Sequence, residues 1–143
     1  MKRAKPINSR AKGAQFERTI AQRLEGLTGV KFQRNLEQVR TVDHCDLLAD
    51  DPAWPFSLEL KRYAVGTGCK PEWRAQAERA AAKNGKAPVV IYQFDRRDVH
   101  VSLPIWVIGR ALGADWAETE WADITLEALA YLAGEIMAAG AEA

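Results

Sequence analysis

Two short apolar segments joined by a tight turn constrain this chain more than any other stretch. Residues 46–48 read Asp-Leu-Leu and residues 56–61 read Phe-Ser-Leu-Glu-Leu-Lys, and the link between them contains Asp-Asp-Pro-Ala at 50–53. Apolar runs bounded by such turn formers are typical of β-strands, so we predict two neighbouring strands. If they pair as a hairpin, Asp46 lies beside Glu59.

The charged residues of this hairpin predict a reaction. Side chains alternate between the two faces of a strand, so Glu59 and Lys61 share one face. Together with Asp46, they place two carboxylates and one ammonium at one end of a sheet. Neighbouring carboxylates repel each other, and a divalent cation such as Mg²⁺, which prefers oxygen ligands, relieves that repulsion. A lysine beside such a cation can orient a water molecule. This combination favours metal-assisted hydrolysis of phosphodiesters.

The Glu-x-Lys triplet alone carries little information. Charged residues make up about a quarter of ordinary chains, so such a triplet arises by chance in roughly every second protein of this size. Its value comes from its position in an apolar strand, after an aspartate strand and after a helical glutamate, Glu17.

Size and composition indicate one globular domain spanning residues 1–143, and 48% of these residues are hydrophobic. No apolar run approaches the length of a membrane span, so we expect no membrane partner. The basic start lacks the apolar segment of a secretory signal. Cys45 and Cys69 form no metal-ligand pattern and are expected as reduced thiols in a cytoplasmic protein.

Charge is segregated along the chain, although the net charge is only +1. Residues 1–34 contain nine Lys and Arg against two Glu, whereas residues 107–143 contain one Arg against seven acids. A basic end facing a polyanion such as DNA would explain this asymmetry. From charge alone, a solvated basic tail followed by an ordinary acidic helix is the better explanation. Residues 1–8 are expected to be a flexible basic arm.

The first predicted helix spans about residues 9–27. Phe16, Ile20 and Leu24 recur every four residues and form one apolar stripe, and Gly29 offers a stop. Glu17 lies at the edge of this stripe, where it either faces the end of the sheet or remains a plain surface residue. A first strand is expected over 30–36, followed by a polar connection that carries Arg40.

A second helix is expected to begin at Pro71 and to stop at Asn84-Gly85. Gln76 falls on its packing face, so it lies at the rim of the active site or bonds to backbone. The remaining expectations are a central strand at 88–94, a neighbouring strand at 99–103, a short helix at 105–112 and a final helix at 124–139.

In this order, the elements and their motifs resemble the PD-(D/E)XK nuclease superfamily, above all the Holliday junction resolvases of the Hjc type and related phage-encoded nucleases. The resemblance covers about residues 9–103 and leaves 104–143 as an added helical extension. It rests on Lys12-Gly13 with Phe16-Glu17-Arg18, on Arg40 before Asp46-Leu47, on Glu59-Leu60-Lys61, and on Gln76 in the second helix. It implies an α/β, restriction-endonuclease-like mixed sheet flanked by helices, with an αβββαβ core.

The resemblance also implies a set of roles. Asp46, Glu59 and the backbone carbonyl of Leu60 would hold Mg²⁺ or Mn²⁺, Lys61 would orient the attacking water, and Glu17 would bind a second metal or position a water. Phosphate or DNA contacts would come from basic and amide side chains: Lys12, Arg18, Arg34, Arg40 and Gln76. A four-way junction has two-fold symmetry and needs two cuts, so a resolvase would be a homodimer. The broad apolar face of the last helix, widened by Tyr131 and Leu132, is the expected interface.

Several alternatives stay open at this level. Asp43 competes with Asp46 as the metal ligand, although His44 follows it where the family has an apolar strand residue. His44 itself is more often a surface residue than a group acting at the phosphate. The same chemistry could act on duplex ends or flaps. A non-catalytic DNA-binding or adaptor module on the same fold is the alternative from another class, although paired carboxylates facing a polyanion argue against it.

Overall fold

A computed structural model describes residues 9–36 and 44–141. These residues form, in order, α1 (Ser9–Thr28), β1 (Phe32–Arg34), β2 (Leu47–Ala49), β3 (Phe56–Tyr63), α2 (Pro71–Asn84), β4 (Ala87–Phe94), β5 (His100–Pro104), α3 (Ile105–Ala111), β6 (Trp121–Ile124) and α4 (Leu126–Ala141). The predicted arm 1–8 lies outside the described residues, as do Arg40 and Asp43 in the predicted connection.

The helix boundaries follow from the expected stop and start signals. α1 ends at Gly29, whose φ of 76° is left-handed and whose N–H donates to the Glu25 carbonyl at 2.8 Å. Pro71 occupies the first turn of α2, where its missing N–H costs nothing, and Gly85 closes the helix with φ of 70°. The sequence prediction of both helices is confirmed.

The described strands form one sheet in the order β1-β2-β3-β4-β5-β6. β1 and β2 are antiparallel, as are β2 and β3, so the predicted hairpin is confirmed. β3 and β4 run parallel, with Phe56 opposite Ala87 and Tyr63 opposite Phe94, because α2 carries the chain back across the sheet. β5 and β6 then continue antiparallel. The sheet is therefore mixed, as expected.

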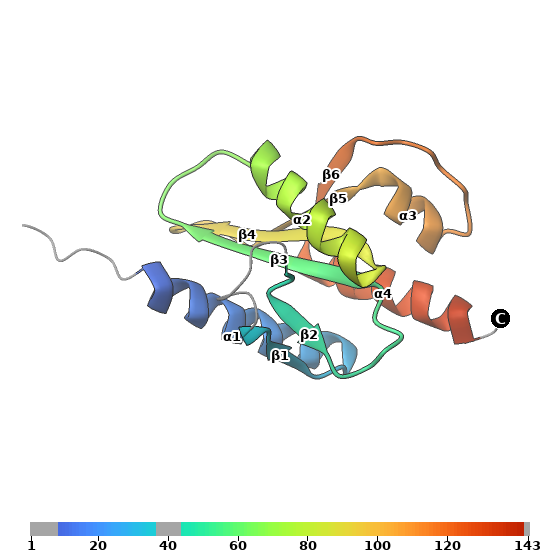
Figure 1. Ribbon diagram of the computed structural model, residues 1–143, viewed down its shortest axis with the longest axis horizontal. Coiled ribbons are helices and arrows are strands. Elements are labelled where there is room, and N and C mark those ends of the chain that lie inside the picture. The colour runs from blue at the N-terminus through green and yellow to red at the C-terminus, as the bar shows by residue number, and fades with distance from the viewer. Residues whose placement is uncertain (1–8, 37–43, 142–143) are drawn as a thin grey trace, which may run out of the picture.

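Helices cover both faces of this sheet (Figure 1). The stripe of α1, with Phe16 and Ile20, packs in one core with Leu58 and Leu60 of β3, and α4 joins the same core. On the opposite face, Trp73 of α2 packs against Val90, Tyr92 and Phe94 of β4. The alternation along β3 thus separates the face with Leu58 and Leu60, which packs in the core, from the face that carries Glu59 and Lys61.

Two expectations for the C-terminal part need correction. Residues 104–143 are not a purely helical extension, because β6 joins the sheet edge beside β5, with Ser102 opposite Asp123. The four residues of β6 lie in an acid-rich segment without a strand pattern, and the free edge of β5 provides their pairing. The broad face of α4 is also not an open interface. Of the two residues expected to widen this face, Leu132 is buried in the protein's own core. Tyr131 is exposed, at 66%.

Helices in the described part of the chain lack the combination of length and apolar character needed to cross a membrane.

Candidate active site

Asp46 is fixed at the junction of three strands, immediately before β2. Its N–H donates to the Leu58 carbonyl at 2.8 Å, and its own carbonyl accepts from the Asn35 N–H at 2.9 Å. Leu47 pairs with Leu58, so Asp46 and Glu59 each lie one residue from this pair, and the charge of Glu59 raises the pKa of Asp46. The predicted proximity of these two carboxylates is confirmed.

The Asp46 side chain turns toward the backbone of β3. Its Oδ2 atom accepts a 2.6 Å hydrogen bond from the Leu60 N–H. The N–H and C=O of one strand residue point to the same edge of a sheet. The Leu60 carbonyl therefore points to the edge at which Asp46 lies, where the resemblance places a backbone ligand.

Glu59 is almost completely enclosed, with 2% of its surface exposed. Its Oε1 atom lies 3.3 Å from the Lys61 Nζ atom, whereas its Oε2 atom is buried and has no hydrogen-bond partner among the residues that the structure describes. A buried carboxylate oxygen without a partner costs free energy. This orphaned oxygen, a second carboxylate and the Leu60 carbonyl are hard oxygen donors of the kind that Mg²⁺ and Mn²⁺ prefer. The residues present therefore fit a divalent cation.

The pKa values of Asp46 and Glu59 reflect a shortage of positive charge around the two carboxylates. Burial, the charge of Glu59 and that of Glu17 hold the pKa of Asp46 well above its usual value, against the opposing hydrogen bond from Leu60. Burial also raises the pKa of Glu59, although the Lys61 ammonium opposes this. Both shifts have the direction expected when two carboxylates lie close together with too little positive charge around them.

Lys61 is held from two sides. Besides its contact with Glu59, its Nζ atom donates a 2.7 Å hydrogen bond to Oε1 of Gln76. Gln76 thus lies at the rim of the site rather than bonded to backbone, which resolves the alternative left open by the sequence. Through this hydrogen bond, the helix that covers the sheet fixes the position of Lys61 on the sheet. Sequence analysis pointed to both residues but not to the bond between them.

Glu17 is buried, as its place beside the apolar stripe suggested, and it is paired with Arg34. The Nε and Nη2 atoms of Arg34 each lie 3.2 Å from Oε1 of Glu17. The described residues contain no group of three or more His, Cys, Asp or Glu side chains that could together hold a metal ion. A role of Glu17 at a second metal or a water therefore stays a proposal, as does a phosphate contact by Arg34.

The other predicted DNA contacts have different surroundings. Arg18 is exposed on α1. The Lys12 Nζ atom lies 2.8 Å from Oδ1 of Asp95, and the same oxygen lies 2.7 Å from Nη1 of Arg62. Sequence analysis missed this cluster, since its three members are far apart in the chain. The only signal was the position of Arg62 directly after Lys61, on the opposite face of β3.

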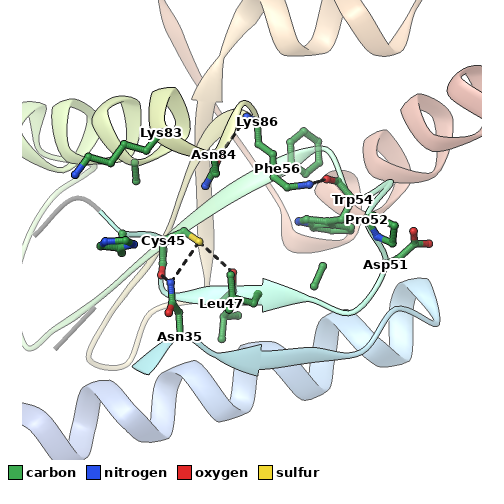
Figure 2. A pocket seen from close by; sticks show the side chains of 14 residues that line it. Asn35, Cys45, Leu47, Asp51, Pro52, Trp54, Phe56, Lys83, Asn84 and Lys86 are labelled. Atoms are coloured by element: carbon green, nitrogen blue, oxygen red, sulfur yellow. Dashed lines mark hydrogen bonds between the residues drawn. The ribbon is translucent and has the colours of Figure 1, made fainter. Parts of the chain in front are cut away.

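Two hollows lie near the candidate site residues. One, of about 390 Å³, lies between the start of α1 and the second half of β3, and is lined by Lys12, Gly13, Leu60, Lys61, Arg62, Tyr63 and Ala64. Figure 2 shows the other, of about 300 Å³, between β2 and the end of α2, with Cys45 and Trp54 in its wall. His44 also lines this second hollow. This second hollow is separate from the predicted site, because its lining includes neither Asp46 nor Glu59 nor Lys61.

Comparison with known proteins agrees with this geometry. The family described as "Phage putative PDDEXK endonuclease" matches residues 8–132. No curated protein matches the chain. Among solved structures, the Holliday junction resolvase Hjc of Archaeoglobus fulgidus is similar with a TM-score of 0.54 and 18% identity, over 85% of this chain and 98% of that one. At this identity the likeness shows a shared fold, the restriction-endonuclease-like one expected from the sequence. The family match covers most of the chain, including β6, and on that ground the chain belongs to the phage PDDEXK endonuclease family.

Proposed function

We propose that this nuclease hydrolyses DNA phosphodiesters with Mg²⁺ or Mn²⁺ and prefers branched DNA, as a junction resolvase does. The observation that carries the proposal is the pair of half-buried Asp46 and buried Glu59, which lie close together beside a lysine that is held in place. A structural role alone gives no reason to bring two acids together at such a place.

The residues would divide the work as follows. Asp46, Glu59 and the Leu60 carbonyl would hold the cation, which supplies Lewis-acid stabilisation of the charge that develops on the phosphodiester. Lys61, positioned by Glu59 and Gln76, orients the attacking water and stabilises that charge with its ammonium. Glu17 positions a water or serves a second cation. Lys12, Arg18, Arg34 and Arg40 contact DNA phosphates.

Preference for a junction is supported by the fold shared with a Holliday junction resolvase. A symmetric four-way junction must be cut twice, so we infer that the active form on this substrate is a homodimer. The apolar face of α4 is buried in the protein's own core and so does not provide its interface.

The test is a cleavage assay on one set of labelled DNAs: a four-way junction, a flap, a blunt duplex and a single strand. Each is incubated with the full chain in Mg²⁺, in Mn²⁺ and in EDTA. We expect cuts in either metal, fastest on the junction, and none in EDTA. Undiminished cleavage in EDTA would overturn the proposed chemistry, and equal cleavage of all four DNAs would overturn the preference. Binding without any cleavage would instead support a non-catalytic DNA-binding module.

A further inference from the structure

An exposed aromatic ring stands at the end of the strand that carries the catalytic residues. Tyr63 closes β3 and stacks on Trp73 of α2, with ring centroids 5.2 Å apart and an interplanar angle of 18°. Trp73 is buried and packs in turn against the rings of Tyr92 and Phe94, at 6.0 and 6.1 Å. One face of Tyr63 is therefore fixed on a rigid aromatic cluster, while 45% of the residue stays exposed.

A lysine lies beside this stack and leaves its outer face open. The Lys70 Nζ atom is 5.7 Å from the Tyr63 centroid and 5.6 Å from the Trp73 centroid. Since the two rings are themselves 5.2 Å apart, the three points form a nearly equilateral triangle. An ammonium over the outer face of Tyr63 would lie much farther from Trp73. Lys70 thus places a positive charge at the edge of the stack.

The position of Tyr63 relates it to the reaction. Tyr63 follows Lys61 by two residues on β3, so both side chains leave the same face of the strand. At about 3.3 Å per residue, their Cα atoms are separated by about 6.6 Å along the strand, close to two base steps of about 3.4 Å in a stacked DNA strand. Both residues also line the hollow that contains Lys12. A nucleotide close to the phosphodiester at Lys61 is therefore within reach of the Tyr63 ring.

We propose that Tyr63 stacks on a DNA base whose face is exposed at a branch point, and that Lys70 pairs with a phosphate of the same strand; this inference rests on the proposed function. Aromatic side chains are general stacking platforms for bases, whatever the base. Inside a continuous duplex, both faces of a base are covered by its neighbours. A base at a branch, a flap or an end offers one free face. Tyr63 thereby makes DNA shape, rather than sequence, the property that is recognised.

The experiment removes the tyrosine ring from the protein and, separately, one base from the DNA. Binding is measured in EDTA, so that no DNA is cut. The probes are a forked DNA and the same fork in which one nucleotide beside the branch point is abasic, with each flanking nucleotide tested in turn. Base stacking contributes about 1–3 kcal/mol per base, which corresponds to roughly 5- to 150-fold in affinity. We expect a loss of about tenfold for the parent protein at one of the abasic positions.

Variants assign this loss to the ring. Tyr63→Leu keeps an apolar side chain on Trp73 but has no aromatic face, so it should bind the abasic and the intact fork equally. Tyr63→Phe should retain the tenfold difference. Tyr131→Leu is the matched control, because Tyr131 is more exposed than Tyr63 but lies on α4. Lys70→Gln should weaken binding and lower its salt dependence by about one phosphate contact. Should Tyr63→Leu lower the melting temperature, Tyr63→Met, whose flexible side chain repacks readily, replaces it.

The outcomes separate this inference from the proposed function. A parent protein that binds and cuts DNA but shows no abasic loss at any flanking position would overturn the role of Tyr63 alone. The same holds if the folded Leu or Met variant keeps the full loss. A parent that binds none of the DNAs would overturn the proposed function, and the stacking role with it.

Discussion

The ammonium of Lys61 donates a 2.7 Å hydrogen bond to the side-chain oxygen of Gln76, and this bond joins β3 to the helix α2 that covers it. Lys61 is a long side chain with several rotatable bonds. Its place beside Glu59 therefore depends on an acceptor that a different element of the chain provides. The precision of the proposed site comes in part from the packing of α2 on the sheet.

Replacing Gln76 with alanine should slow cleavage more than it weakens DNA binding. A hydrogen bond to a charged group contributes about 1.5–3 kcal/mol, so we expect a decrease in the cleavage rate of about 10- to 100-fold. Single-turnover cleavage and binding in EDTA measure the two effects separately. Glu78→Ala, an exposed change on the same helix, should leave both unchanged. An affinity that falls by the same factor as the rate would mean that Gln76 contacts DNA instead of positioning Lys61.

Neutral isosteres of Asp46 and Glu59 should abolish cleavage and spare the fold. Asp46→Asn and Glu59→Gln keep size but remove the charge that would hold a cation, and we expect a loss of several kcal/mol in transition-state stabilisation. DNA affinity in EDTA should hold or rise, because a negative charge facing the phosphates is gone. Asp43→Asn is the control and should stay active. Normal cleavage by Asp46→Asn together with an inactive Asp43→Asn would show that the ligand is the other aspartate.

The stability of the metal-free protein should depend on pH through Asp46. The pKa of Asp46 in the native state is raised above the ordinary 3.8. At pH values between 3.8 and this raised pKa, the native state therefore binds more protons than the unfolded state. The contribution of Asp46 to stability is therefore lost as pH rises through this window. Asp46→Asn cannot titrate, so its stability relative to the parent should increase from about pH 4 upward. Urea denaturation in EDTA across this range measures the difference. A difference that is constant with pH would contradict a raised pKa.

A divalent cation should offset the loss of stability caused by the ionised carboxylates, and it should do so in the parent protein but not in the variants. A ligand that binds the native state stabilises it by mass action, so Mg²⁺ or Mn²⁺ should raise the melting temperature of the parent. Asp46→Asn and Glu59→Gln should show little or no increase. An equal increase in all three proteins would place the cation elsewhere on the molecule.

Salt should distinguish two arginines of α1. Arg18 is exposed, whereas Arg23 lies 3.2 Å from Glu127 of α4. If Arg18 contacts a phosphate, Arg18→Ala should reduce the slope of log affinity against log salt by about 0.9, whereas Arg23→Ala should leave it unchanged. Deleting residues 1–8, which contain Lys2, Arg3 and Lys5, should flatten the slope further. Equal slopes in all these proteins would exclude phosphate contacts by this end of the chain.

Sequence patterns predicted those features of the fold and the site that depend on residues close together in the chain. The Asp46–Glu59 neighbourhood could be predicted, since a short turn between two apolar segments leaves few alternatives to a hairpin. The pairing of Arg34 with Glu17 could not, because it depends on where β1 lies against α1. The cluster around Asp95 joins residues up to 83 positions apart. β6 could not be predicted either, because its pairing is determined by the edge that β5 offers rather than by its own four residues.

The brevity of β2 has a consequence for how copies of this protein behave toward one another. Within the described residues, β2 pairs with β3 only at Leu47 and Leu58, and the bond from Asp46 adds one step. Beyond the hydrogen bond from the Leu60 N–H to Asp46, no described strand pairs with this edge of β3 from Lys61 to Tyr63. An open strand edge is a template onto which another chain can add, and charged side chains are a common protection against such aggregation. Lys61 and Arg62 lie on this edge, and Lys12 lines the hollow beside it. The positive charge that would attract a nucleic acid would therefore also repel a second copy of the same basic edge, and so oppose aggregation where DNA would bind.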